Sequence, residues 1–173
     1  MEYLRIEDFD KIFRLMELSF IEDEYRNYEA QKHLLTLDNY TIFVEYHETG
    51  DVMAFIALWV FDAFVYIEHF VVNPKYRNRG LGGKLLTHIL DKYDRRICLE
   101  VEHPEDALKI RRIEFYKRNG FYLNDYAYIQ PPLSEGKAPL SLKIMTSHKS
   151  VDAAFFNEIK ATLYEHVYMK KDR

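Results

Sequence analysis

The chain has 173 residues, of which 48% are hydrophobic, and its formal net charge is −4. This length suits one domain with a sizeable core, and the negative charge argues against nucleic acid as a partner. No apolar run approaches the roughly 20 residues of a membrane helix, and the charged start from Glu2 is unlike a signal peptide. Cys98 is the only cysteine, which excludes an internal disulfide. We therefore expect a cytoplasmic protein that does not bind membranes.

The first half of the chain is predicted to hold two helices and then a run of strands. Residues 1–4 suggest a short first strand, and apolar residues at helical spacing predict helices over 6–20 and 28–37, separated by a polar break. Alternating or continuous apolar residues predict strands over 41–46, 52–61 and 65–72. The turn at residues 47–51 offers Gly50 for positive φ, as a hairpin requires.

The second half alternates more regularly between strands and helices. Apolar spacing predicts helices after Leu81 and over 107–118, the latter ended by Asn119-Gly120, and strands over 97–101, 121–129 and 140–145. A terminal helix is predicted over residues 151–169. The pattern predicts an α/β fold, with a mixed and mostly antiparallel sheet flanked by helices, in a single domain over 1–173 whose core spans about 1–146.

A basic, glycine-rich loop lies between the strand at 65–72 and the helix that follows. Its sequence is Arg77-Asn78-Arg79-Gly80-Leu81-Gly82-Gly83, so three of the six glycines fall within four positions. Glycine allows close approach of a ligand to the backbone and permits positive φ. The first N–H groups of a helix lack intrahelical partners and carry a partial positive charge. Together with Arg77, Arg79 and Lys84, these features predict a phosphate-binding loop.

Two motifs give the chain a resemblance to the GNAT superfamily of acyl-CoA-dependent N-acyltransferases. Arg77-Asn78-Arg79-Gly80-Leu81-Gly82 matches the family pattern (Gln/Arg)-x-x-Gly-x-(Gly/Ala), and Phe115-Tyr116 followed by Gly120-Phe121 matches the second signature. The resemblance covers about residues 1–146 and implies the GNAT fold, with the terminal helix as an addition. Lys109 and Arg112 stand where the family often has Asn and a small residue, so Lys109, Arg111 or Arg112 is a candidate phosphate contact in place of the Asn.

The resemblance implies roles for residues in both motifs. The loop would hold the pyrophosphate of acetyl-CoA, and the strand end before it would offer backbone groups to the pantetheine arm where neighbouring strands splay apart. The implied cofactor-binding residues are Phe70, Val71, Val72, Arg77, Asn78, Arg79, Gly80, Leu81, Gly82, Gly83, Lys84 and Arg112. Tyr116 would be the general acid that protonates the leaving thiolate, although packing at a helix end explains it too.

Glu68 is the candidate general base because it is a carboxylate within an apolar strand. Desolvation would raise its pKa toward the range that suits proton transfer. Strand alternation predicts that Glu68 and His69 point to opposite faces, which makes His69 a packing residue. Glu100 and Glu102 are the rival candidates for the general base, and they share one face of the next predicted strand. There they either attract a cationic amine, or face solvent or pair with Arg111 and Arg112. Further candidates for acceptor binding are Glu24, Tyr25 and His103.

The sequence therefore predicts transfer of an acetyl group from acetyl-CoA to a primary amine, by direct attack in a ternary complex. The acidic and aromatic residues favour a small cationic amine as the acceptor. No metal site is expected because the histidines lack ligand spacing. The terminal helix is a candidate interface for a homodimer. The alternative from another class is a non-catalytic acyl-CoA sensor on the same fold, and a doubly wound nucleotide-binding domain is disfavoured by the hairpin at Gly50.

Overall fold

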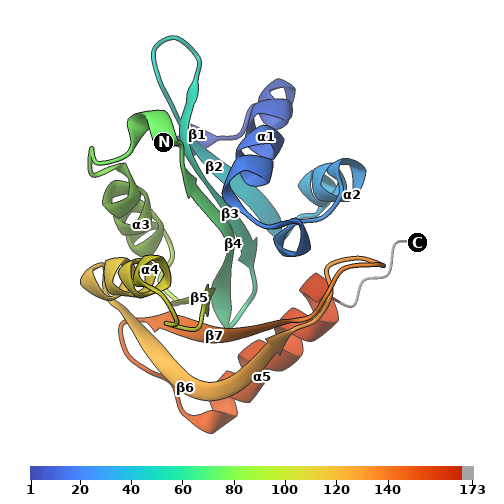
Figure 1. The fold of residues 1–173 in the computed structure, drawn as a ribbon, viewed down its shortest axis with the longest axis vertical. Helices are drawn as coiled ribbons and strands as arrows, with labels where there is room; N and C mark the ends of the chain where they lie inside the picture. Colours follow the sequence, from blue (N-terminus) through green and yellow to red (C-terminus); the bar gives the residue numbers. More distant parts are fainter. Residues whose placement is uncertain (169–173) are drawn as a thin grey trace. The chain divides into compact units, whose positions relative to one another are not determined.

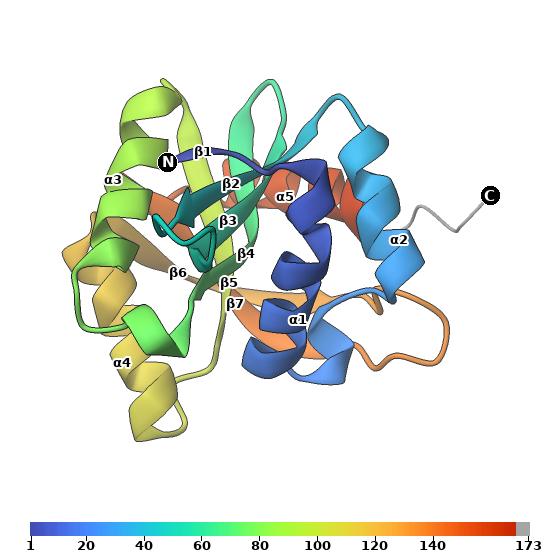
Figure 2. The same cartoon turned by 90° about the horizontal axis from the view of Figure 1, so that it is seen from above.

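The structure is a computed structural model that describes residues 1–168. The chain divides into two compact units, residues 1–95 and a second unit that begins at Arg96. Each unit carries its own antiparallel strands and its own helices (Figures 1 and 2). The expectation of a single domain remains a prediction.

The first unit is built on four antiparallel strands in the order β1-β2-β3-β4. They are β1 (Glu2–Tyr3), β2 (Tyr40–Tyr46), β3 (Val52–Val60) and β4 (Phe64–Val72). β3 is the most buried of the four, and six consecutive residues, 54–59, are almost inaccessible to solvent. A continuous apolar run fits such a strand because helices cover both of its faces. The hairpin between β2 and β3 has Gly50 at φ +83°, as predicted.

Helices cover both faces of these strands. α1 (Phe9–Ser19) and α2 (Tyr28–His33) lie on one face, and α3 (Leu81–Lys92) lies on the other (Figures 1 and 2). Short 3₁₀ turns precede or extend them at Ile6–Asp8, Glu22–Glu24, Leu34–Thr36 and Pro74–Tyr76. Asn27 begins α2 as an N-cap, because its Oδ1 accepts a hydrogen bond from Ala30 N at 2.8 Å.

A β-bulge interrupts the pairing of β3 with β4. Ala57 pairs with His69 and Leu58 pairs with Ile67, so Glu68 has no opposite residue. A bulge inserts one extra residue and locally resets the alternation of side chains. The prediction that Glu68 and His69 face opposite sides is therefore wrong: the Glu68 Oε2 and His69 Nδ1 atoms lie 3.7 Å apart, and both side chains are buried.

The second unit has three antiparallel strands in the order β5-β7-β6. They are β5 (Arg96–Glu102), β6 (Phe121–Gln130) and β7 (Leu140–Ser147). α4 (Ala107–Arg118) and α5 (Ala153–Leu163) lie on opposite faces of these strands (Figures 1 and 2), and a π-helical turn over Tyr164–Tyr168 extends α5. The bounds of α4 match the prediction, whereas the predicted terminal helix reached Met169, which lies outside the described residues.

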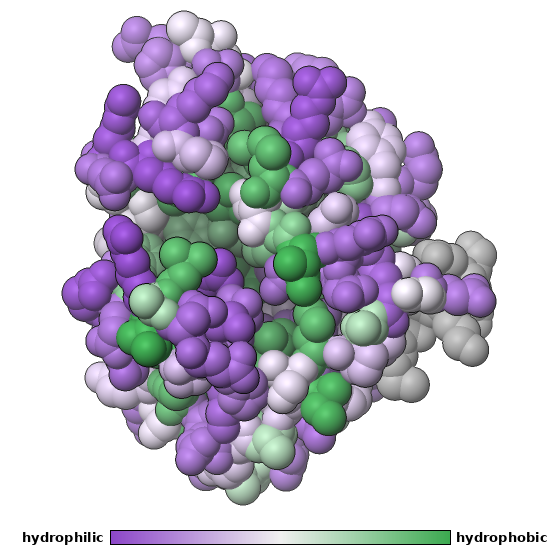
Figure 3. Space-filling view, in the orientation of Figure 1, coloured by the Kyte–Doolittle hydropathy of each residue, from purple (hydrophilic) through white to green (hydrophobic). Residues whose placement is uncertain are grey.

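The strand directions confirm the predicted fold class. Every pair of neighbouring strands within each unit is antiparallel, which disfavours a doubly wound nucleotide-binding domain. Among residues 1–168, no helix is long and apolar enough to cross a membrane. The face drawn in Figure 3 is mainly hydrophilic with apolar residues interspersed, which is ordinary for a protein surface.

Candidate functional site

The glycine-rich loop is held at its start by hydrogen bonds to the β2–β3 hairpin. Asn73 donates from Nδ2 to the Val52 carbonyl at 2.9 Å, and the Tyr76 hydroxyl donates to Asp51 Oδ2 at 3.2 Å. Arg77 Nε then donates back to the carbonyl of Val72, at the end of β4, at 3.1 Å. These hydrogen bonds attach the start of the loop to the β2–β3 hairpin and to the end of β4, which preorganises its backbone before α3 begins.

Gly80 is the N-cap of α3 and adopts the left-handed conformation at φ +74°. Asn78, two residues earlier, is also left-handed at φ +62°. The first intrahelical hydrogen bond of α3 runs from Lys84 N to Gly80 O, so Leu81, Gly82 and Gly83 present N–H groups that the helix does not use. No side chain caps this end of α3. These backbone donors suit an anionic ligand.

The basic side chains of the loop are available to such a ligand. Arg77, Arg79 and Lys84 are exposed, and none forms a salt bridge with another residue in the described part of the chain. The Arg79 guanidinium lies 5.5 Å from the centre of the Tyr76 ring, a cation–π arrangement that leaves its N–H groups accessible. Two kinds of donor, backbone N–H and cationic side chain, therefore meet at this loop.

Glu68 is paired with a cation that the sequence analysis did not single out. Arg26 Nη1 donates to Glu68 Oε1 at 2.6 Å, and the two side chains are 7% and 3% exposed. Arg26 lies between the turn at Glu22–Glu24 and α2, so the ion pair joins the α1–α2 connection to the bulge in β4. The second carboxylate oxygen, Oε2, is buried without a hydrogen-bond partner.

The pKa of Glu68 is lowered, which corrects the predicted rise. Burial alone raises the pKa of this carboxyl, but the opposing influences, of which the charge of Arg26 is the largest, outweigh it. Desolvation dominates only where no cation is near. The sequence offered no way to foresee the pairing, because Arg26 is 42 residues from Glu68 and sits within an acidic run.

Glu24 and Tyr25 have structural contacts in the same connection. Glu24 Oε2 accepts a hydrogen bond from Ile21 N at 3.1 Å and so caps the short turn, while its backbone carbonyl accepts from His69 Nε2 at 2.8 Å. Tyr25 packs edge-on against Phe13, with ring centres 5.8 Å apart. Burial, followed by the charges of Glu17 and Glu22, raises the pKa of Tyr25.

Tyr116 lies near the end of α4 in the second unit. It is 8% exposed, and its ring packs edge-on against Phe115 and Phe121 at 5.3 and 5.8 Å between centres. Burial raises the pKa of Tyr116 to about 12, against a smaller opposing effect of Arg112. The phenol is therefore protonated at neutral pH and can donate a hydrogen bond.

Glu102 and Arg112 form the ion pair that was one of the two expected arrangements. Arg112 Nη1 donates to Glu102 Oε2 at 2.7 Å, and both side chains are partly exposed. His103 follows directly, and its Nε2 shares a hydrogen bond with Ser141 Oγ at 3.1 Å. Arg112 therefore has a carboxylate partner, unlike the cations of the glycine-rich loop.

Glu100 is bound by tyrosines. Tyr168 donates to both of its carboxylate oxygens, at 2.8 and 2.9 Å, and Tyr128 also donates to Oε1. Tyr168 closes the π-helical turn, so this cluster attaches the end of the terminal helix to β5. Burial, then the charge of Glu100, raises the pKa of Tyr128 well above its usual range.

Tyr168→Phe should reduce the free energy of unfolding by about 1.5–3 kcal/mol, the range for hydrogen bonds to a charged group. The loss is expected because the carboxylate of Glu100 would keep only part of its buried hydrogen bonding. Urea unfolding measures it. Tyr122→Phe is the matched control, since Tyr122 is 49% exposed, and should change stability by less than about 0.5 kcal/mol. An equal effect of the two substitutions would contradict the attachment of the helix through Glu100.

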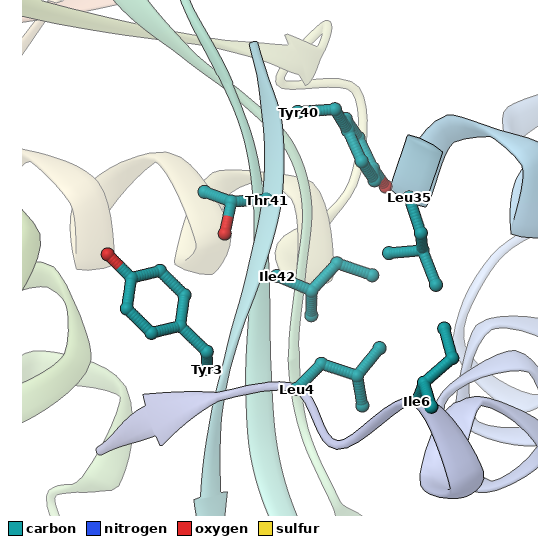
Figure 4. Close-up of a pocket in the computed structure, with 7 residues that line it drawn as sticks. All are labelled: Tyr3, Leu4, Ile6, Leu35, Tyr40, Thr41 and Ile42. Atoms are coloured by element: carbon teal, nitrogen blue, oxygen red, sulfur yellow. The ribbon is translucent and has the colours of Figure 1, made fainter. Parts of the chain in front are cut away.

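A small surface pocket of about 200 Å³ lies on the first unit, away from the loop. Leu4, Ile6, Leu35 and Ile42 converge on it, whereas Tyr3 and Thr41 project to the other side of β2 (Figure 4). Its lining is largely apolar, with tyrosines as the only titratable residues, so it lacks acid–base groups for chemistry near neutral pH. Among residues 1–168, no group of three metal-ligating side chains converges.

Comparisons with known proteins agree with the motifs. The model of the acetyltransferase (GNAT) family matches residues 6–121. A solved "Putative acetyltransferase from GNAT family" from Bacteroides thetaiotaomicron is 32% identical, with a TM-score of 0.88 over 99% of this chain and 100% of that one. The "Putative acetyltransferase YjbC" of Bacillus subtilis is 29% identical over 115 residues, 65% of this chain and 59% of that protein.

A more distant similarity concerns the fold alone. A mutant of the spermidine N-acetyltransferase SpeG from Vibrio cholerae is 15% identical and has a TM-score of 0.64 over 84% of this chain and 92% of that one. The family match spans most of the chain and includes the glycine-rich loop and the Phe115–Phe121 segment. The chain belongs to the GNAT family of acetyltransferases.

Proposed function

We propose that the protein transfers the acetyl group of acetyl-CoA to a primary amine of a small cationic molecule. The observation that carries this proposal is the loop from Arg77 to Gly83. It combines a left-handed Gly80, three N–H groups that α3 does not use, and cations without carboxylate partners among the described residues. This donor set fits a pyrophosphate, which is the part of CoA that a helix N-terminus binds best.

The residues proposed to hold acetyl-CoA divide into backbone and side-chain donors. Leu81, Gly82 and Gly83 would bind phosphate oxygens through N–H groups, and Arg77, Arg79 and Lys84 would neutralise their charge. The backbone of residues 70–72 would hold the pantetheine arm, a role that rests on the family resemblance. Bound in this way, acetyl-CoA supplies an activated acyl group, and the amine attacks it directly in a ternary complex.

The acceptor is proposed to be a cationic amine because acidic groups are concentrated in the α1–α2 connection. Glu22, Asp23 and Glu24 lie there in succession. The similarity in fold to a spermidine N-acetyltransferase is consistent with an amine acceptor. Glu100, Glu102 and His103 are proposed as further acceptor contacts. A cytoplasmic location and a homodimer formed through the terminal helix remain part of this proposal.

Tyr116 is proposed to assist departure of the thiolate. With a pKa near 12 it is protonated throughout the neutral range, so it can donate a hydrogen bond to the sulfur as negative charge develops. The same raised pKa makes complete proton transfer less favourable. Stabilisation by a hydrogen bond is therefore the role that the pKa supports best.

Tyr116→Phe should lower kcat about 100-fold, the lower end of the range for acid–base groups, and leave acetyl-CoA affinity unchanged. The phenyl ring should preserve the packing against Phe115 and Phe121 and hence the fold. Steady-state release of CoA thiol measures the rate, and thermal unfolding checks the fold. Equal activity of the variant and the wild type would show that the phenol only packs.

The proposed function is tested by calorimetry with acetyl-CoA alongside a panel of amines assayed for thiol release. The panel should contain polyamines, amino acids, simple diamines and a peptide with a free N-terminus. Acetyl-CoA binding with turnover on cationic small amines is the expected result. Binding without turnover on any amine would favour a non-catalytic acyl-CoA sensor, and absence of binding would refute both functions.

A further inference from the structure

The bulge in β4 brings together two buried side chains, Glu68 and His69, whose facing atoms can each accept a proton. His69 Nε2 lies 2.8 Å from the backbone carbonyl of Glu24. A carbonyl oxygen can only accept, so Nε2 carries the hydrogen and Nδ1 of the neutral ring holds a lone pair. Nδ1 has no hydrogen-bond partner and faces Glu68 Oε2, which also has none, at 3.7 Å.

We propose that Glu68 and His69 form one proton-accepting site, in which the proton lost by the acceptor's ammonium group comes to rest on His69 Nδ1. This inference rests on the proposed function. The N–H bond of the ammonium breaks and leaves its electron pair on nitrogen, ready to attack the thioester. A new N–H bond forms at Nδ1, and the imidazolium donates to Glu68 Oε2. The proton returns to solvent before the next turnover.

The groups around the pair favour a negative charge on Glu68 and a neutral ring at His69. Arg26 faces Glu68 from the α1–α2 connection, Tyr40 faces it from β2, and Trp59 lies on β3. Burial, followed by the opposing charge of Glu68, leaves the pKa of His69 lowered overall, so the ring is neutral at pH 7. The lone pair of Nδ1 then has no hydrogen-bond partner. Glu68, held ionised by Arg26, is the natural partner for an imidazolium.

Geometry also explains why the ring can act from a buried position. Phe20 packs edge-on against His69 with ring centres 5.0 Å apart, and the Glu24 carbonyl holds the far side of the ring. The imidazole is therefore fixed in one tautomer and one orientation. Glu68 Oε2 is the polar atom directed at Nδ1, so the proton reaches the ring through this oxygen. His69 acts through Glu68 and need not touch the acceptor.

Nuclear magnetic resonance of the labelled full-length protein tests the pair without relying on turnover. The His69 imidazole, assigned by its loss in His69→Gln, should show the Nε2–H tautomer at pH 7 and a pKa below that of a free histidine. Glu68→Gln should lower that pKa further, because the imidazolium loses its carboxylate partner while Arg26 keeps a hydrogen-bond acceptor. A Nδ1–H tautomer, or a His69 pKa unaffected by Glu68→Gln, would overturn the proposal.

Kinetics test the role of the pair in acetyl transfer. His69→Gln can keep a donor to the Glu24 carbonyl while removing the titrating nitrogen, and it should lower kcat at pH 7 about 10²–10⁴-fold. The deficit should shrink as the pH approaches the pKa of the acceptor amine, because that amine then needs no base. Acetyl-CoA affinity should stay unchanged. His33→Gln, at an exposed position of α2, is the matched control with wild-type rates.

The pH dependence of the rate deficit distinguishes a role in proton transfer from a structural role. A rate deficit that is the same at every pH would identify a structural role and overturn the proposal, as would an unchanged rate. If His69→Gln does not fold, Glu68→Gln should show the same pH-dependent deficit, and its absence would count against the pair. A wild-type protein without turnover on any amine would refute the proposed function. The NMR titration of His69 would still test whether Glu68 and His69 form the proposed proton-accepting pair.

Discussion

Gly80→Val should weaken acetyl-CoA binding at least tenfold, equivalent to about 1.4 kcal/mol of binding free energy. Gly80 sits at φ +74° as the N-cap of α3. The left-handed conformation costs an ordinary L-residue about 1–2 kcal/mol, and a β-branched residue is the least suited to it. The loop would relieve this strain by shifting, which would turn the N–H groups of residues 81–83 away from the phosphate. Calorimetry with acetyl-CoA measures the loss.

The matched control for this prediction is Gly136→Val. Gly136 has φ +84°, and an added Cβ at either glycine meets nothing within 4 Å, so the two substitutions introduce the same backbone strain without a clash. Both should lose similar stability, but only Gly80→Val should lose affinity. Gly80→Asn should lose less than Gly80→Val, because asparagine tolerates this conformation and Asn78 already adopts it. Equal affinity of the Gly80→Val and Gly136→Val proteins would exclude the loop as the binding site.

Arg26→Met should reduce the free energy of unfolding by about 3–5 kcal/mol, the range for breaking a buried ion pair from one side. The Arg26 and Glu68 side chains are 7% and 3% exposed, so the remaining carboxylate would lie in a site that water barely reaches. Replacing both residues, as Arg26→Met with Glu68→Gln, should recover a large part of the loss because no charge is left buried. Chemical denaturation of the three proteins at pH 7 provides the measurement.

An exposed ion pair supplies the control for Arg26→Met. Lys143→Met removes the Lys143–Asp125 pair, whose carboxylate is 96% exposed, and should cost no more than about 1 kcal/mol. If the double variant were as unstable as Arg26→Met alone, loss of packing by the arginine side chain would explain the effect better than the unpaired charge. A cost of Arg26→Met below that of Lys143→Met would contradict the buried ion pair itself.

The Glu68–Arg26 pair also predicts how stability depends on pH. The folded-state pKa of Glu68 lies below its unfolded value of about 4.3, so its contribution is present above that pH. The contribution is lost as the pH falls through the folded-state pKa. In Arg26→Met the largest remaining influence is burial, which raises the pKa of Glu68. Acid unfolding of that variant should therefore begin at a higher pH than in the wild type.

Local patterns determined most of the secondary structure. The bounds of α4 follow from apolar spacing and the Asn119-Gly120 stop, and Gly120 adopts φ +83° as such a stop requires. The order of helices and antiparallel strands and the hairpin at Gly50 were likewise predictable. These features depend on periodicity and on backbone conformations that few residue types adopt, so neighbouring residues suffice to predict them.

The tertiary structure decided the environment of the predicted side chains. Glu68 and His69 share a face only because β4 carries a bulge opposite Ala57 and Leu58, where strand alternation alone places them apart. The pKa of Glu68 is lowered because Arg26 reaches it across 42 residues of sequence, and Glu100 is bound by Tyr168 across 68. Alternation and propensity are properties of neighbouring residues, whereas burial and ion pairing depend on which distant segments meet. The sequence therefore predicted the family and the phosphate-binding loop, and only the fold identified the partners that set the charge of Glu68 and the tautomer of His69.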